Sequence, residues 1–252
     1  MSDTSTSAGA TYLNDGRRFT DYTAYRHRAD SPNETLERPV FMAMVGAVQG
    51  LDILDLGCGD GLYGRELLDA GCRSYTGIEA AQTMAAAATQ NLQGTAAQIV
   101  HDTIEAWPFP TAQFDLAVSR LALHYVADLA TTFRGVYGAL RPGGRFVFSI
   151  VHPVITASDK SRTAGGVRQD WIVDDYFVPG PRPVYFMGDH VQQIHRTIEE
   201  IFGTLQLSGF VVEQLRESCP RPEHFTDEAL YARRQRIPLF LFLAGKKAST
   251  TE

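Results

Sequence analysis

The sequence predicts an α/β domain with a parallel β-sheet covered by helices on both faces. Between residues 49 and 153, short apolar segments alternate with segments rich in helix-forming residues. Such alternation is typical of a parallel sheet whose crossover connections are helices. The chain has 252 residues, of which 44% are hydrophobic and 21% charged. This length and composition suit one large globular domain with a full core.

The N-terminal region precedes the alternation. It begins with a stretch rich in Ser, Thr, Ala and Gly, so we expect residues 1–18 to be disordered. Residues 19–48 are expected to form one or two amphipathic helices, which break near Ser31-Pro32 because proline disfavours a continuous helix.

The core region, residues 49–153, supplies the alternating elements. Gly71 ends the first helical segment, and the second is rich in strong helix formers. An Arg-Pro-Gly-Gly turn precedes the last strand of this region. We expect strands over 51–56, 74–79, 97–102, 114–120 and 145–151, and helices over 63–70, 81–92 and 129–140.

Residues 154–193 do not continue the alternation. Two stretches, 171–178 and 184–188, are rich in aromatic and β-branched residues and are expected to be extended. The Pro-Gly-Pro-Arg-Pro sequence between them favours a turn. We therefore expect a β-hairpin inserted into the sheet domain.

Residues 194–248 complete the core. A helical segment over 197–209 ends in a glycine, and two further strands are expected over 210–218 and 237–247.

The charge and the cysteine content exclude several classes of protein. The net charge is −6, so no basic surface for nucleic acid is expected. Cys58, Cys72 and Cys219 lie far apart and form no CxxC pair, which indicates free thiols in a reducing compartment. No His, Cys or Asp cluster has metal-ligand spacing, so no metal is expected.

Neither a secretion signal nor a membrane span is expected. The first residues lack the basic and apolar regions of a signal peptide. No apolar run approaches the roughly 20 residues that cross a bilayer. We therefore expect a cytoplasmic protein without a membrane partner.

A glycine-rich motif, ILDLGCGDG over residues 53–61, includes the end of the first core strand. A glycine turn between a strand and a helix brings backbone N–H groups and a helix N-terminus toward a ligand. The spacing G-x-G-x-G differs from the G-x-G-x-x-G of dinucleotide sites, and no lysine follows as in a phosphate-binding P-loop. On the glycines alone, a tight turn without a ligand is an alternative.

Acidic residues end the next two core strands. Glu79 ends the second, where a carboxylate can accept both hydrogen bonds of a ribose diol. Asp102 ends the third, near the expected place of an adenine amino group. Since ligands of open parallel sheets bind outside the carboxyl ends of the strands, these acids and the glycines together predict a nucleoside site.

The chain resembles class I S-adenosylmethionine-dependent methyltransferases of the type 11 small-molecule group. The resemblance rests on ILDLGCGDG, GIEAAQTM, HDTIEAWPFPTAQFDLAVSRLALHYVAD and LRPGGRFVFS, in the family's order between Gly50 and Ile150. It implies a Rossmann-like seven-stranded sheet in the order 3-2-1-4-5-7-6 with strand 7 antiparallel, and residues 237–247 fit that last strand. It also implies S-adenosyl-L-methionine as cofactor and an N-terminal helical lid over it.

The resemblance assigns roles to single residues. The glycine motif wraps the methionine end of the cofactor, and Ser119 lies along the same moiety. Glu79 holds the ribose, although the family usually has Asp at this position, and Asp102 with the next two residues faces the adenine. The implied cofactor-binding residues are Asp55, Gly57, Cys58, Gly59, Gly61, Glu79, Ala80, Met84, Asp102, Thr103, Ile104 and Ser119, with Tyr25 and Arg26 from the lid.

His124 is the candidate catalytic residue. It follows the fourth core strand, close to where family members present side chains toward the donor methyl. A neutral imidazole there can take a proton from a phenol, an enol-like carbon or an indole N–H. The rate would then rise with pH through a pKa of about 6.5. The alternative is a histidine that packs beside Tyr125 and shapes the pocket wall.

Substrate contacts are expected from the segments around the core. Arg120 suits an anionic substrate or an ordinary ion pair, and His152 suits the cleft or an ordinary strand-end cap. The aromatic residues of the inserted hairpin form either a substrate lid or plain packing. As a lid, the hairpin of residues 166–188 would cover the substrate and not the cofactor. The candidate substrate-binding residues are Tyr22, Arg120, His152, Trp171, Tyr176 and Tyr185, with Phe177, Phe186 and His195 as further candidates.

The sequence therefore predicts methyl transfer to a small aromatic or heterocyclic metabolite, at O, N or C. The Asn/Asp-Pro-Pro-Tyr/Phe motif of nucleic-acid N-methyltransferases is replaced here by SRLALHY, so no nucleic-acid partner is expected. A methyltransferase-like binding protein without activity and a nicotinamide-dependent oxidoreductase are the alternatives. We expect a monomer or a homodimer.

Overall fold

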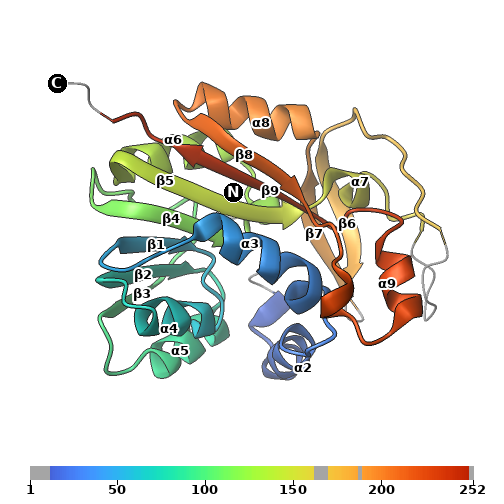
Figure 1. The fold of residues 1–252 in the computed structure, drawn as a ribbon, viewed down its shortest axis with the longest axis horizontal. Helices are drawn as coiled ribbons and strands as arrows, with labels where there is room; N and C mark the ends of the chain where they lie inside the picture. The colour runs from blue at the N-terminus through green and yellow to red at the C-terminus, as the bar shows by residue number, and fades with distance from the viewer. Residues whose placement is uncertain (1–11, 162–169, 187–188, 250–252) are drawn as a thin grey trace, which may run out of the picture.

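A seven-stranded sheet forms the centre of the protein, in a computed structural model that describes residues 12–161, 170–186 and 189–249. The strand order is β3-β2-β1-β4-β5-β9-β8 (Figure 1). β1 to β5 are parallel, whereas β9 is antiparallel to both β5 and β8. This order confirms the expected 3-2-1-4-5-7-6 arrangement with its antiparallel last strand. The strands are β1 (Asp52–Leu56), β2 (Ser74–Glu79), β3 (Ala97–His101), β4 (Phe114–Arg120), β5 (Leu140–Val151), β8 (Val211–Glu217) and β9 (Phe240–Lys246).

Helices cover both faces of the sheet because its strands are buried on both sides. Neighbouring residues Ile53 and Leu54 of β1 point to opposite faces, as alternate residues of a strand do, and each belongs to a different core cluster. One face packs against α3 (Arg38–Val45), α4 (Leu62–Asp69) and α5 (Gln82–Asn91). The other face packs against α6 (Leu129–Ala139) and α8 (Ile198–Leu207). The predicted helices of the core are therefore present in their predicted places.

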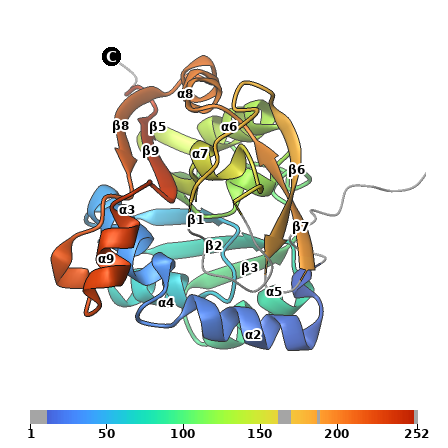
Figure 2. The same cartoon turned by 90° about the vertical axis from the view of Figure 1, so that its right-hand side faces the viewer.

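Three further segments lie around the carboxyl ends of the parallel strands. Figure 2 looks onto this edge and shows α2 (Gly16–Arg26), α9 (Glu228–Arg234) and the hairpin of β6 (Gly180–Phe186) and β7 (Asp189–His195) around it. Shorter turns complete the same end of the molecule: η1 (Asn33–Glu37), η2 (Leu123–Tyr125), α7 (Pro153–Thr156) and η3 (Pro222–His224). This arrangement encloses the edge where ligands of open parallel sheets bind.

The inserted hairpin exists, but its strands differ from those predicted. Residues 171–178 form no strand, and the proline-rich sequence belongs to β6 instead of making the turn. Pro181 and Pro183 are two residues apart, so both lack an N–H on the same side of β6. A two-stranded sheet tolerates this because each strand has one unpaired edge. The proline cluster was therefore wrongly interpreted as the turn.

The chain before α2 is ordered from residue 12 onward, which corrects the expected disorder of residues 12–18; residues 1–11 lie outside the described part. Asp15 caps α2, since its Oδ1 accepts hydrogen bonds from the N–H groups of Arg17 and Arg18, both at 3.0 Å. The Asn14 side chain accepts a hydrogen bond from the backbone N–H of Gln82 at 2.8 Å. These contacts fix the segment against the start of α5. Within the described residues, no helix has both the length and the apolarity that a membrane span needs.

Candidate functional site

The glycine motif forms the turn between β1 and α4. Gly57, Gly59 and Gly61 have φ angles of +81°, +61° and +76°, a conformation that glycine adopts without strain. A Cβ on Gly57 would lie 2.4 Å from the Cβ of Ala122, whereas a Cβ on Gly59 would meet nothing within 4 Å. The motif is therefore packed closely against the chain after β4 and leaves open space beside Gly59.

A cavity lies over this turn, and we call it the glycine-loop cavity. It encloses about 950 Å³ of space, open solvent at its mouth included, which suits a nucleoside-sized ligand. Of the residues predicted to bind the cofactor, the lining includes Gly57, Gly59, Glu79, Ala80, Met84, Thr103, Ile104 and Arg26.

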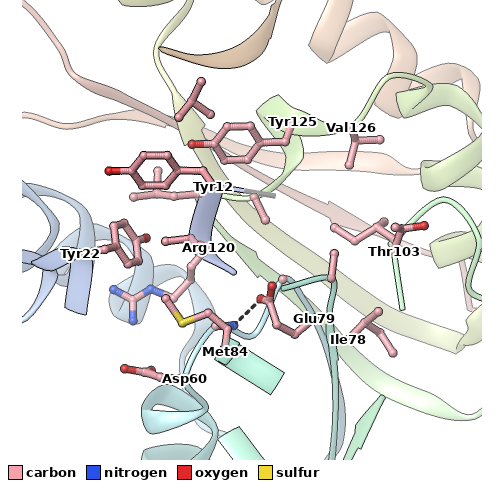
Figure 3. A pocket seen from close by; sticks show the side chains of 18 of the residues that line it. Tyr12, Tyr22, Asp60, Ile78, Glu79, Met84, Thr103, Arg120, Tyr125 and Val126 are labelled. Atoms are coloured by element: carbon pink, nitrogen blue, oxygen red, sulfur yellow. Dashed lines mark hydrogen bonds between the residues drawn. The ribbon is translucent and has the colours of Figure 1, made fainter. Parts of the chain in front are cut away.

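Glu79 is held in place at the end of β2 and faces the glycine-loop cavity (Figure 3). Its Oε2 accepts a hydrogen bond from the N–H of Gly59 at 2.9 Å, and its Oε1 accepts one from the N–H of Ala81 at 2.8 Å. Burial raises the pKa of Glu79, and these backbone donors act in the opposite direction. Each carboxylate oxygen accepts more than one hydrogen bond, so both retain capacity for a ligand.

Several predicted cofactor residues do not line the glycine-loop cavity. Ser119 is fully buried and donates a hydrogen bond to the carbonyl of Leu56 at 2.7 Å, which joins β4 to β1. The Oδ1 of Asp102 accepts a hydrogen bond from the N–H of Thr103 at 2.8 Å. Gly61 packs against α5 instead. Cys58 is also outside this lining.

Asp55 is buried inside the fold instead of facing the ligand side. Its Oδ2 accepts a hydrogen bond from the Tyr75 hydroxyl at 2.7 Å, while its Oδ1 is buried without a partner among the described residues. Burial raises the pKa of Asp55 to about 6, and its hydrogen bond with Tyr75 and the charge of Arg120 act in the opposite direction. Asp55 therefore contacts the neighbouring strand β2 from the next-to-last position of β1, which indicates a structural role.

The raised pKa of Asp55 predicts a pH-dependent stability. Because the folded-state pKa of Asp55, about 6, exceeds its usual value of 3.8, folding favours the protonated carboxyl group. The stability that the protonated Asp55 contributes is complete below pH 3.8 and is lost as the pH rises through 6. Asp55→Asn should remove this pH dependence. The unfolding free energy of the variant minus that of the wild type should therefore be about 1–2 kcal/mol larger at pH 8 than at pH 5. Urea unfolding at both pH values measures the difference. The control is Asp69→Asn at an exposed position. An equal change of the unfolding free energy relative to the wild type between pH 5 and pH 8 in the two variants would contradict the prediction.

A second cavity adjoins the first, and we call it the arginine cavity. It is lined by Arg26 of α2, by Arg233 and Arg234 of α9, and by Trp171, Gln193 and the apolar end of β9. Four residues line both cavities: Tyr22, Arg26, Leu121 and Tyr125. Ligands bound in the two cavities would therefore meet across these side chains.

Arg120 forms an ion pair. Its guanidinium Nη2 lies 2.5 Å from Oε2 of Glu37, a residue of η1 that is fully buried. The guanidinium also lies 4.9 Å from the centroid of the Tyr63 ring. Oε1 of Glu37 accepts a further hydrogen bond from Ser149 at 2.7 Å. The charge of Arg120 is thus balanced within the protein, which favours the ion-pair alternative over an anion-binding role.

His124 lies in η2 and lines the arginine cavity. Burial, and then the charge of Arg196, lowers the pKa of His124 to about 3, so the imidazole is neutral at physiological pH. Its Nδ1 is buried and has no hydrogen-bond partner among the residues described. A rate that rises with pH near 6.5 is therefore not expected from this side chain.

The other predicted substrate residues have different surroundings. Trp171 and Tyr22 line the arginine cavity, and so does Tyr25, which was expected at the cofactor. His152 caps α7 and contacts Glu217 at 2.9 Å, the cap that was the alternative interpretation.

The remaining hairpin candidates are mostly structural. The Tyr176 hydroxyl accepts a hydrogen bond from the N–H of Ile198, and His195 is buried between Thr156 and the carbonyl of Tyr176. Phe177 is 83% exposed. The side chains of Tyr185 and Phe186 lie outside the described part.

The hairpin contributes to both cavities. Gln193 of β7 lines the arginine cavity, but Val191 of the same strand lines the glycine-loop cavity. Val191 lies outside residues 166–188, for which the covering was expected, so the expectation that this segment covers the substrate and not the cofactor stays a prediction.

Sequence reasoning missed lining residues at both ends of the chain. Tyr12 and Leu13 line the glycine-loop cavity from the segment expected to be disordered. Arg233 and Arg234 belong to a helix that was not predicted. Asp227 caps this helix by accepting hydrogen bonds from two backbone N–H groups, and an Asp before a run of helix formers was an available signal. In the part of the chain that the structure describes, no three His, Cys, Asp or Glu residues form a group able to hold a metal ion.

Comparison with known proteins agrees with this geometry. Residues 54–148 match the model of a methyltransferase domain family. The crystal structure of an S-adenosylmethionine-dependent methyltransferase from Mesorhizobium loti superposes with a TM-score of 0.77 and 34% identity, covering 86% of this chain and 99% of that one. A malonyl-[acyl-carrier protein] O-methyltransferase of Enterobacter lignolyticus (strain SCF1) is 37% identical over 108 residues, which are 43% of this chain and 42% of that protein. A ubiquinone biosynthesis O-methyltransferase of Methylobacterium sp. (strain 4-46) is 31% identical over 165 residues, with 65% and 61% covered.

The fold and the cavity at its strand ends define a Rossmann-like class of protein with a nucleoside-sized site. The match to the Mesorhizobium loti enzyme over nearly its whole length shows more. The chain belongs to the S-adenosylmethionine-dependent methyltransferases, and S-adenosylmethionine is its cofactor.

Proposed function

We propose that the protein transfers a methyl group to a small molecule, with the cofactor in the glycine-loop cavity and the acceptor in the arginine cavity. The observation that carries this proposal is the shared lining of the two cavities by Tyr22, Arg26, Leu121 and Tyr125. A methyl group passes directly between two ligands only when they meet, and proximity and alignment supply much of the rate.

The residues of the glycine-loop cavity fit the cofactor. The Glu79 carboxylate is fixed by two backbone N–H groups and suits the ribose hydroxyls. Ile104 and Met84 offer apolar surface for the adenine, and the open space beside Gly59 admits the methionine part. When bound, the cofactor supplies a methyl group on a positively charged sulfur.

The lining of the arginine cavity favours an aromatic or heterocyclic acceptor. Tyr22, Tyr25, Tyr125 and Trp171 supply aromatic surface, which packs well against flat apolar rings. Burial and the charge of Arg196 lower the pKa of His124 to about 3, which makes its imidazole a weak base, so we assign it to the cavity wall. The proton of the acceptor would then pass to solvent water and not to His124.

A methylation assay with a mixture of metabolites tests this function. The protein is incubated with S-adenosylmethionine and the ultrafiltrate of a bacterial extract, and S-adenosylhomocysteine and methylated products are measured by mass spectrometry. We expect both products, and Trp171→Ala should reduce their formation at least about tenfold while cofactor affinity stays within about threefold.

Trp107→Phe is the matched control, since Trp107 packs against Phe109 outside both cavities. Methylation only of the macromolecules retained by the filter would contradict the proposal. Normal cofactor binding without any product would favour a binding protein.

A further inference from the structure

The arginine cavity carries an excess of positive charge. Arg26, Arg233 and Arg234 line it, and no Asp or Glu does so among the described residues. The chain as a whole is acidic, with 29 Asp and Glu against 23 Lys and Arg. The positive charge of this cavity therefore does not follow from the overall charge of the chain.

The two arginines of α9 have no acidic partner within the described parts of the chain. Arg234 has a buried Nε without a hydrogen-bond partner. The Arg233 guanidinium lies 5.2 Å from the centroid of the Trp171 ring, a contact that orients the group without neutralising it. Burial, and then the neighbouring charge of Arg233, lowers the pKa of Arg234. A buried donor on a charged group is costly unless a partner satisfies it.

The cofactor does not account for this charge. Arg26 lines both cavities and faces either ligand, but Arg233 and Arg234 line the arginine cavity only. The other polar groups of the described lining are uncharged side chains: Asn33, Gln193, His124 and the hydroxyls of Tyr22, Tyr25 and Tyr125. No acidic side chain of the described lining therefore competes with an anionic ligand for the two guanidinium groups.

Resting on the proposed function, we propose that the methyl acceptor carries an oxyanion, a carboxylate or a phosphate ester, which binds to Arg234 and Arg233. A guanidinium group matches the geometry of either anion and forms charge-assisted hydrogen bonds with it. The aromatic lining holds the apolar part of the same molecule. The acceptor class is accordingly a small aromatic acid.

Binding to the protein saturated with S-adenosylhomocysteine tests the proposal. The probes are benzoate, phenylacetate and indole-3-acetate, each compared by calorimetry with its neutral amide, and phenyl phosphate. At least one carboxylate should bind about tenfold or more tightly than its amide. A still tighter phenyl phosphate would assign the anion to a phosphate ester, and a weaker one to a carboxylate.

Variants of Arg234 locate the effect. Arg234→Gln should abolish the preference for the acid over the amide, Arg234→Lys should retain part of it, and the exposed control Arg216→Gln should leave it unchanged. The affinity for S-adenosylhomocysteine should stay within about threefold in all three. Equal binding of acid and amide in the wild type, including equal absence of binding at millimolar concentration, would overturn the proposal, and so would an unchanged preference in Arg234→Gln. Failure of S-adenosylhomocysteine to bind would instead contradict the proposed function.

Discussion

Arg120→Met should lower the free energy of unfolding by about 3–5 kcal/mol at pH 7, the usual cost of removing one partner from a buried ion pair. The variant leaves Glu37, which is fully buried, charged and without its guanidinium partner. The Ser149 hydroxyl still donates to Glu37, but one neutral hydrogen bond does not balance a buried charge. Urea unfolding followed by circular dichroism measures the loss.

Two further variants show whether the ion pair is the cause. Glu37→Gln combined with Arg120→Met removes both charges and should recover a large part of the lost stability. Arg38→Met removes a partly exposed arginine that pairs with Glu34 and Glu66, and it should cost less than about 1 kcal/mol. A small loss in Arg120→Met would mean that Arg120 is not needed to balance Glu37.

Glu79→Ala should weaken the binding of S-adenosylhomocysteine by about 2–3 kcal/mol, or roughly 30- to 150-fold. The variant removes the carboxylate that suits the ribose hydroxyls and also frees the N–H of Gly59. Calorimetric titration of the wild type and the variant gives the two dissociation constants. Asp102→Ala should cost less, because its side chain does not line the glycine-loop cavity.

Asp69→Ala is the control for this prediction, since Asp69 ends α4 at an exposed position. Its affinity for S-adenosylhomocysteine should equal that of the wild type. An unchanged affinity in Glu79→Ala, with a normal unfolding transition, would place the ribose elsewhere.

The sheet could be predicted from the sequence because its signals are local. Apolar strands and glycine stops place the elements along the chain, the resemblance to the family implies the strand order, and Glu79 follows from its place at a strand end. Side-chain direction within a strand is harder to predict. Asp55 and Ser119 lie in motif positions, yet both point to neighbouring elements, and their contacts with Tyr75 and Leu56 join residues far apart in the chain.

The residues of the arginine cavity, the proposed acceptor site, could be predicted only in part. Trp171 was identified from its aromatic character, but the proline-rich sequence beside it was interpreted as a turn. Arg233 and Arg234 come close to α2 only after the chain has passed through six of the seven strands of the sheet, so no spacing in the sequence connects them. The charge balance of Arg120 likewise depends on Glu37, 83 residues away.

The two cavities draw on different stretches of the chain. Most described residues of the glycine-loop cavity lie within the matched region 54–148, whereas Trp171, Gln193, Arg233 and Arg234 lie after it. If the acceptor binds in the arginine cavity, as proposed, changes in α9 should alter the choice of acceptor and leave the lining of the glycine-loop cavity intact. For protein engineering, the proposal makes α9 the segment to exchange between relatives when a new acceptor is wanted.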